Sequence, residues 1–286
     1  MGGKKPMRVV VLGDTGMLGG MVVKYLETQE DLHVIGISRR DGLAIHPSYN
    51  MVSLLNKIPA LNSPDYIINC IGAIKPVFND KTRLQEGIYT NAIFPHELEE
   101  WNHRFEVGAR IIHITTDCVF NGYLGGYTES SPHNPLDEYG KSKSLGEPED
   151  VMVLRTSIIG PEWNGNKRSL VEWLLSQKGK EVNGFSNHMW NGVTTLELAR
   201  MIGDIIHRDL WSKGTKHLYS HDVNKYELIN LMNKTWELGI KVNEAEAKSF
   251  CNRTLRTIYQ LNSLLEPNNM VDMIQDLSSF MVDANV

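Results

Sequence analysis

The sequence has few of the features that would set it apart from ordinary globular proteins. It has three cysteines in 286 residues, Cys70, Cys118 and Cys251, which lie far apart and form no Cys-x-x-Cys pair. Neither a disulfide framework nor a metal site is indicated, and a reducing, cytoplasmic compartment is expected. No apolar run approaches the roughly 20 residues that a membrane-spanning helix needs.

A large excess of charge is also missing. The formal net charge is -5 and the sequence pI is about 6.1, so neither a nucleic acid nor a membrane surface is expected as a partner. Hydrophobic residues make up 41% and charged residues 22% of the chain, which is ordinary globular composition. The length suits one or two domains.

The first 160 residues alternate short apolar runs with helical patterns. Strands that are apolar on both faces and separated by helices predict a parallel sheet covered on both sides, as in a Rossmann-type doubly wound α/β fold. The expected strands cover residues 9–12, 33–38, 66–70, 110–115 and 151–155. The expected helices cover residues 17–28 and 84–101, with a break or kink at Pro95.

The sequence pattern changes after Gly160, where polar loops separate shorter helices. Helices are expected over residues 170–177, 194–207 and 224–236, and a strand over residues 217–220. We therefore predict a Rossmann domain over residues 1–160 and a smaller, mainly substrate-binding lobe over residues 161–286. Some segments of the second part are expected to return to the first.

A glycine-rich loop, Gly13-Asp-Thr-Gly-Met-Leu-Gly19, lies between the first strand and the first helix. Glycine permits a tight turn and lets backbone amides approach a pyrophosphate, and the helix N-terminus adds its positive end. A bare turn would be the alternative, but the strand–turn–helix context favours a dinucleotide. The predicted contacts are Gly13, Thr15, Gly16, Met17 and Leu18.

The end of the second strand indicates which dinucleotide binds. An acidic residue there would accept the ribose hydroxyls of NAD, but the sequence has Ser38, Arg39 and Arg40. Two guanidinium groups can hold the 2′-phosphate of NADP(H), although Asp41 follows and a solvated basic loop is the alternative. Ile71, Gly72 and Ala73, after the third strand, complete the predicted cofactor-binding set, together with Tyr139 and Lys143.

Three residues form a candidate catalytic group. Tyr139 and Lys143 have the Tyr-x-x-x-Lys spacing, which places both side chains on one face of a helix. A nearby ammonium is expected to lower the pKa of the phenol, which then protonates a carbonyl oxygen as hydride reaches its carbon. Thr116, at the end of the fourth strand, is placed to hydrogen-bond that oxygen; ordinary strand propensity is its alternative explanation.

Several motifs together resemble the dTDP-4-dehydrorhamnose reductase family of extended short-chain dehydrogenases. They are the glycine loop with its GxxGxxG spacing, Thr-Thr-Asp-Cys-Val-Phe-Asn-Gly, Tyr-Gly-Lys-Ser-Lys-x-x-Gly-Glu, Leu-Arg-Thr-Ser-Ile-Ile-Gly, Asn91-Ala-Ile-Phe-Pro95 and Asn224-Lys-Tyr-Glu-Leu228. The resemblance implies a nicotinamide cofactor and reduction of a 4-keto-6-deoxy nucleotide sugar. It also implies Thr116, Tyr139 and Lys143 as the catalytic triad.

One position departs from that family, which usually has tyrosine where this sequence has Cys118. The slot holds cysteine in the similar GDP-4-keto-6-deoxymannose and plant-type UDP-rhamnose epimerase/reductases. In the GDP-sugar enzymes the cysteine works with a distant histidine, and His188 lies at a similar separation. A thiol and an imidazole could share the acid and base roles of epimerisation. Packing for Cys118 and a loop hydrogen bond for His188 are the alternatives.

The sequence thus predicts NADPH-dependent reduction of a nucleotide-linked 4-keto-6-deoxy-hexose, combined with 3- or 5-epimerisation or both. A plain reductase is one alternative. Another is a non-catalytic binding module, since the regulatory subunit of methionine adenosyltransferase resembles the same family. UDP- and dTDP-sugars are favoured over GDP-sugars, and a homodimer is left open. Residue type and context suggest Arg168, Trp190 and Arg253 as nucleotide contacts.

Overall fold

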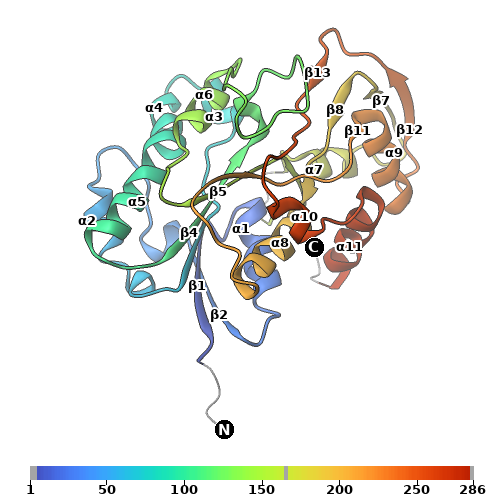
Figure 1. Cartoon of the computed structure of the whole chain (residues 1–286). Coiled ribbons are helices and arrows are strands. Elements are labelled where there is room, and N and C mark those ends of the chain that lie inside the picture. The colour runs from blue at the N-terminus through green and yellow to red at the C-terminus, as the bar shows by residue number, and fades with distance from the viewer. Residues whose placement is uncertain (1–4, 164–166, 284–286) are drawn as a thin grey trace.

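The computed structural model describes residues 5–163 and 167–283, and a six-stranded parallel sheet lies at its centre (Figure 1). The order is β2-β1-β3-β4-β5-β10, so the sheet grows in one direction from β1 to β2 and in the other from β3 onward. This is the predicted Rossmann-type doubly wound sheet. Its strands are β1 (Met7–Leu12), β2 (Leu32–Ile37), β3 (Tyr66–Asn69), β4 (Arg110–Thr116), β5 (Met152–Thr156) and β10 (Gly214–His217).

Alternating side chains of the apolar strands divide the core between the two faces of the sheet. In β1, Val9 and Val11 join one cluster, whereas Val10 and Leu12 join the other. Helices α1 (Met17–Leu26) and α8 (Thr195–His207) contribute to the first cluster. Helices α2 (Met51–Leu55) and α5 (Phe94–Arg104) contribute to the second. Burying each such side chain stabilises the fold by roughly 1.5–3 kcal/mol, which explains why the strands are apolar on both faces.

The long helix expected over residues 84–101 is interrupted, as Pro95 led us to expect. It consists of α4 (Leu84–Ile88), a π-helical turn η3 (Tyr89–Ile93) and α5. Pro95 lies in the first turn of α5, where its missing N–H costs nothing. The π-turn carries the buried Asn91, which reappears in the candidate site.

Most of the chain after residue 160 forms small sheets and helices beside the carboxyl edge of the large sheet (Figure 1). Helix α9 packs against β7 and β12, and α11 packs against α8 and α9. The strands of the small sheets, of which β6 lies just before residue 160, are β6 (Ile158–Ile159), β7 (Glu181–Phe185), β8 (His188–Trp190), β9 (Val193–Thr194), β11 (Val223–Asn224), β12 (Lys241–Ala245) and β13 (Cys251–Asn252). The helices are α7 (Leu170–Leu175), α9 (Lys225–Thr235), α10 (Leu261–Leu265) and α11 (Met270–Asp283).

Two elements of this part return to the large sheet: α8 covers one face, and β10 is the edge strand next to β5. The strand predicted over residues 217–220 was misplaced, because β10 ends at His217. The cause is a polar start, Gly214-Thr-Lys, which hides the strand from an apolar pattern. The division of the chain into a Rossmann domain and a substrate-binding lobe at residue 160 stays a prediction.

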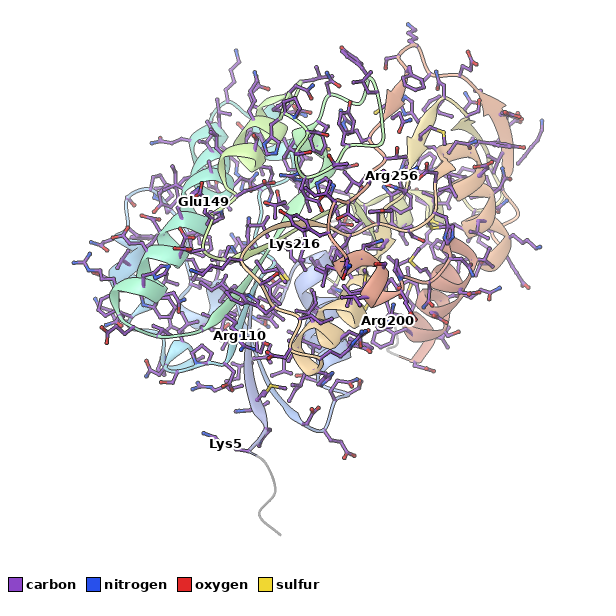
Figure 2. The ribbon with its side chains drawn as sticks, in the orientation of Figure 1. Lys5, Arg110, Glu149, Arg200, Lys216 and Arg256 are labelled. Carbon is purple, nitrogen blue, oxygen red and sulfur yellow. The ribbon has the colours of Figure 1, made fainter. Side chains whose placement is uncertain are left out.

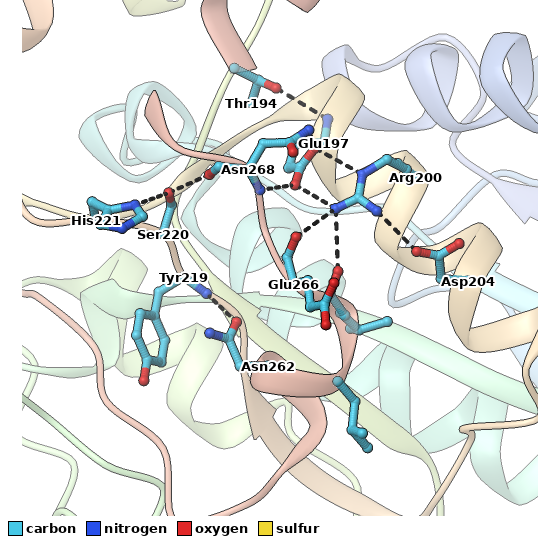
Figure 3. Close-up of polar contacts among 12 residues, drawn as sticks. Thr194, Glu197, Arg200, Asp204, Tyr219, Ser220, His221, Asn262, Glu266 and Asn268 are labelled. Atoms are coloured by element: carbon cyan, nitrogen blue, oxygen red, sulfur yellow. Dashed lines mark hydrogen bonds and ion pairs between the residues drawn. The ribbon is translucent and has the colours of Figure 1, made fainter. Parts of the chain in front are cut away.

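The connection from residue 253 to residue 269, here called the C-terminal connection, is held by polar contacts. The carboxylate of Glu197 accepts from the Asn268 backbone at 2.7 Å and from Arg200 at 2.7 Å (Figure 3). Nearer the start of the connection, Arg256, which is labelled in Figure 2, pairs with Asp222 at 2.7 Å. These contacts fix the connection where it passes the carboxyl edge of the sheet.

The remaining short elements are η1 (Arg39–Asp41), η2 (Pro59–Leu61), η4 (Asp117–Val119) and α3 (Lys75–Asn79). Helix α6 (Glu138–Leu145) carries part of the candidate site. In the described ranges, no helix is both long enough and apolar enough to cross a membrane.

Candidate active site

The glycine loop joins β1 to α1 as the sequence predicts. Gly13 has a φ of +90°, and its backbone N–H donates to the Ile37 carbonyl at 2.7 Å. A Cβ on Gly19 would lie 2.1 Å from the Gly13 carbonyl oxygen, so a side chain at residue 19 would force the loop and the helix apart. The loop is therefore built for close backbone approach at the carboxyl edge of the sheet.

The amino end of α1 is open to a ligand. Gly16 is its N-cap residue, which has no side chain to cap that end. Thr15 is exposed in the loop, while Met17 and Leu18 form the first turn. Uncapped amides and the positive end of the helix fit a pyrophosphate. A dinucleotide fits this loop, and the contacts of the individual residues remain predictions.

The end of β2 is more structured than a solvated basic loop. Ser38 is buried and caps η1, accepting from the Arg40 amide, while Asp41 accepts from the Ser38 amide at 2.9 Å. Asp41 is thus used in local capping. Arg39 is exposed, and Arg40 forms an ion pair with Asp14 of the glycine loop at 2.8 Å. No local sequence pattern connects Asp14 with Arg40.

The turn after β3 lies against α6. A Cβ on Gly72 would be 2.9 Å from Nζ of Lys143, so this glycine leaves room for the ammonium. The next residue, Ala73, donates its N–H to Asn91 Oδ1 at 2.7 Å and accepts from Asn91 Nδ2 at 2.9 Å. The same Nδ2 donates to a serine hydroxyl of α6 at 3.1 Å. Asn91 therefore ties the predicted cofactor turn, Ile71 to Ala73, to the helix that carries Tyr139 and Lys143.

Thr116 and Tyr139 meet at the end of β4. Thr116 is the last residue of that strand, and its hydroxyl accepts from the Cys118 amide at 3.2 Å. Tyr139 lies in the first turn of α6 and shares a side-chain hydrogen bond with Thr116. Lys143 follows one turn later and is buried. The three residues of the predicted catalytic group therefore lie together at the carboxyl edge of the sheet.

The electrostatics of this group differ from the expectation in one respect. Burial, followed by Cys118 and nearby carboxylates, raises the pKa of Tyr139, although a hydrogen bond from Thr116 lowers it. The expected lowering by Lys143 is not found, since buried phenolate loses its hydration. Burial also lowers the pKa of Lys143 to about 8, against the opposing effect of Glu147. The phenol is thus protonated at neutral pH, as a proton donor must be.

Cys118 lies beside the catalytic group rather than in the deep core. It is partly buried, and it affects the pKa of Tyr139. Burial and Asp117 raise the pKa of the Cys118 thiol to about 12, while Arg253 and Lys75 lower it. With its pKa raised this far, the Cys118 thiol does not titrate near neutrality. At neutral pH Cys118 is a thiol and can only donate a proton.

His188 is the first residue of β8 and lies half-buried in the C-terminal part. Its Nε2 lies 2.9 Å from the Ser249 carbonyl oxygen, so Nε2 carries the proton and Nδ1 is left as an acceptor. Strand pairing places Cys251, not Cys118, opposite His188. No hydrogen bond joins Cys118 to His188 among the residues that the structure describes. A paired role for the two stays a prediction.

Three cations surround this corner of the molecule. Arg253 donates to the Phe120 carbonyl at 2.9 Å and interacts electrostatically with Asp117 and Cys118. Lys225, at the start of α9, is more deeply buried; its Nζ lies 4.9 Å from the centre of the Trp190 ring. Lys75 pairs with a carboxylate of the Tyr139 helix cap at 2.8 Å. Lys225 and Arg253 are partly buried and Lys75 is exposed, and a cluster of three cations suits an anionic ligand.

The sequence anticipated only part of this cation cluster. Arg253 was suggested, whereas Lys225 and Lys75 were missed. Lys225 falls within the Asn-Lys-Tyr-Glu-Leu motif, but that motif alone assigned no role to the lysine. Trp190 is buried, and its indole donates to Ser157 Oγ at 2.8 Å. Arg168 is exposed, and no contact places its guanidinium in this cluster within the described chain.

Comparison with known families and proteins shows what the chain is similar to. Residues 7–260 match the family described as RmlD substrate binding domain. The spore coat polysaccharide biosynthesis protein SpsK of Bacillus subtilis is 24% identical over 271 residues, which cover 90% of this chain and 89% of that protein.

A second relative is of a different kind. Methionine adenosyltransferase 2 subunit beta of Bos taurus is 30% identical over 243 residues, which cover 77% of this chain and 70% of that protein. In the rat and mouse subunits the matched segment covers only 41% of the protein.

Among solved structures, dTDP-4-dehydrorhamnose reductase from Bacillus anthracis, in complex with NADP, has the same fold. The TM-score is 0.77 at 21% sequence identity, and the match covers 96% of this chain and 99% of that chain. The ligand of that enzyme agrees with the cofactor expected from the sequence.

Proposed function

Because the chain belongs to the RmlD substrate binding domain family, we propose that it is an NADPH-dependent reductase of a nucleotide-linked 4-keto-6-deoxy-hexose. The observation that carries the proposal is the meeting of Thr116, Tyr139 and Lys143 at the edge of the sheet where the glycine loop opens. Ligands of open α/β sheets bind at this edge.

The cofactor fits the residues at this edge. The start of α1 suits the pyrophosphate, and the Lys143 ammonium, for which Gly72 leaves room, suits the nicotinamide ribose. NADPH supplies the hydride to C4 of the sugar. Arg39 and Arg40 are the proposed contacts of the 2′-phosphate, as bidentate guanidinium donors.

A residue of the chain itself donates the proton. Thr116 and Tyr139 donate hydrogen bonds to the keto oxygen, and Tyr139 transfers its proton to that oxygen as C4 is reduced. The raised pKa of the phenol keeps it protonated beforehand. Lys143, as an ammonium, holds the ribose and supports the phenolate that Tyr139 becomes. Asn91 keeps α6 in register with the cofactor turn.

Cys118 and His188 are proposed to add epimerisation at C3, C5 or both. A 4-keto group acidifies these C–H bonds, and inversion needs a base on one face of the ring and an acid on the other. His188 has Nδ1 available as a base, and Cys118 is protonated and serves as the acid. Cys118 lies in η4 and His188 in β8, so the acid and the base come from separate elements and can approach the ring from different sides.

The cation cluster is proposed to hold the nucleotide part of the substrate. Lys225 and Arg253 are partly buried and interact electrostatically with Asp117 and Cys118, so a diphosphate would gain charge-assisted contacts there. UDP- and dTDP-linked sugars are the proposed substrates, and the cytoplasm, where the three free cysteines stay reduced, is the proposed compartment.

A second function is favoured by one comparison. The 30% identity to methionine adenosyltransferase 2 subunit beta supports a non-catalytic cofactor-binding module. The assembled Thr116, Tyr139 and Lys143 support the enzyme instead.

A substrate panel separates the two functions. Purified protein is offered UDP-, dTDP- and GDP-linked 4-keto-6-deoxy sugars with NADPH, and NADPH consumption is followed. The reductase consumes NADPH with at least one sugar, and Lys143→Ala loses that activity. NADPH binding without turnover on any sugar would favour the binding module.

A further inference from the structure

Asp14 is the one acidic residue of the glycine loop, and it lies where a cofactor phosphate would approach. Its side chain is 14% exposed, and its Oδ2 accepts from Nη2 of Arg40 at 2.8 Å. Arg40 is 70% exposed and extends from η1 toward the loop. The ion pair therefore bridges the turns after β1 and β2, which flank the adenosine end of a dinucleotide.

The surroundings of Asp14 offer its carboxylate little else. Its Oδ1 is buried and has no hydrogen-bond partner in the described ranges. Beneath it is Gly36 of β2, where a Cβ would lie 2.7 Å from the Asp14 Cβ and 2.9 Å from its Oδ2. The glycine thus makes room for the aspartate. Arg40 is the only ion-pair partner of Asp14 among the described residues, so losing it would leave a mostly buried carboxylate uncompensated.

We propose that Asp14 lowers the preference of the chain for NADPH over NADH, by competing with the 2′-phosphate of NADPH for Arg40. This inference rests on the proposed contact between Arg40 and the 2′-phosphate. A phosphate that recruits Arg40 strips Asp14 of its counter-charge and brings two anions together. NADH has a 2′-hydroxyl in place of that phosphate and leaves the ion pair intact.

The competition also limits how strongly the two arginines can favour NADPH over NADH. Arg39 is exposed and forms no ion pair within the described ranges, although it lies close enough to Glu86 to lower the pKa of that carboxyl, so it can turn to the phosphate. Arg40 is shared. The result is a preference for NADPH that is smaller than two unopposed guanidinium groups would give.

The test is direct binding, measured from the fluorescence of NADPH and NADH on titration into the full chain. Asp14→Asn keeps the shape and removes the charge. It should tighten NADPH by about three- to tenfold, the scale of one partly exposed charge pair, and change NADH by less than twofold. Asp14→Ser serves as a second variant, and thermal melting checks that both fold.

Two controls show whether Asp14 acts through Arg40. Glu30→Gln makes the same charge change in the turn before β2, away from the cofactor edge, and should leave both affinities unchanged. In an Arg40→Ala background the gain from Asp14→Asn should shrink to less than twofold. Adenosine 2′,5′-bisphosphate and AMP, used as fragments, should reproduce the difference without the nicotinamide.

Each remaining outcome overturns the proposal. An unchanged ratio of NADPH to NADH affinity in folded Asp14→Asn would remove Asp14 from cofactor selection, while leaving the proposed reductase untouched. An equal gain with and without Arg40 would mean simple repulsion of the phosphate. Failure of the wild-type chain to bind either cofactor would refute the proposed cofactor itself.

Discussion

At the level of single residues, two opposing influences set the charge of Lys143. Burial lowers its pKa to about 8, while Glu147 raises it. The ammonium is therefore present below that pH and lost above it. Between about pH 8 and the ordinary lysine value of 10.5, the unfolded chain holds a proton that the folded chain lacks, so this group makes the fold more stable as pH rises.

We predict that activity and stability respond to this titration in opposite directions. The kcat/KM for NADPH, which reports groups of the free enzyme, should fall by up to tenfold per pH unit above about 8. Lys143→Met should abolish turnover yet raise the free energy of unfolding, by at most about 3 kcal/mol at neutral pH. A pH–rate profile and urea unfolding check the two halves. A flat profile up to pH 10 would contradict the role of the ammonium.

Cys118 carries a second prediction at this scale. In heavy water the proton returned to carbon during epimerisation is a deuteron, so the product should contain deuterium at C3, C5 or both. Cys118→Ser keeps the size and weakens the acid, so exchange should collapse by about 10²-fold or more while reduction of an epimerised sugar survives. Mass spectrometry of the product provides the measurement. Normal reduction without any deuterium in the wild-type product would leave Cys118 as packing.

Sequence reasoning reached these residues unevenly. Tyr139, Lys143 and Thr116 were found because their spacing and strand position are local signals. The buried-state pKa values of Tyr139 and Cys118 were not, since desolvation depends on which distant segments cover them. The Asp14–Arg40 pair was missed for a similar reason: 26 residues separate its members in the chain.

Among the elements, the π-helical turn η3 connects the two halves of the site. Its Asn91 is fully buried and uses both amide atoms on Ala73, and Nδ2 also contacts α6. A regular α-helix followed by a proline kink, as the sequence predicted, gave no reason to single out this side chain. π-Turns of this type often occur at functional sites.

Replacing Asn91 by alanine tests this connection. The change leaves the N–H and C=O of Ala73 without their partner in a buried place, so we expect a loss of about 2–4 kcal/mol in the free energy of unfolding. Turnover should fall further than stability alone explains, because α6 is no longer held in register. Denaturant unfolding and steady-state kinetics at a temperature where the variant is folded separate the effects. Wild-type turnover in a folded variant would count against the positioning role.

At the scale of the whole molecule, the parallel sheet and its two-sided core followed from the sequence, because apolar strands and amphipathic helices are local patterns. The way the C-terminal connection crosses the carboxyl edge did not. It depends on contacts such as Glu197 to Asn268, which join residues 71 positions apart. Helix α11 and the small sheets of the same part carry weaker patterns and were not anticipated.

We predict that Glu197 anchors this connection. Its side chain is 3% exposed and accepts from the Asn268 backbone and from Arg200 (Figure 3). Glu197→Ala should cost about 3–5 kcal/mol, because Arg200 loses its buried partner. Hydrogen exchange should rise across the C-terminal connection and α11, while β1 to β4 stay protected. Uniform exchange across the chain would show that Glu197 does not anchor this segment in particular.

The central claim is that the group of Thr116, Tyr139 and Lys143 reduces a keto sugar with hydride from NADPH. NADPH carrying deuterium at the transferred position of the nicotinamide tests it most directly, with the best sugar of the panel as acceptor. We predict one deuterium at C4 of the product, and in Tyr139→Phe a rate lower by about 10²–10⁴-fold with NADPH affinity nearly unchanged. A product without deuterium at C4, or a Tyr139→Phe variant that works at the wild-type rate, would contradict the assigned chemistry.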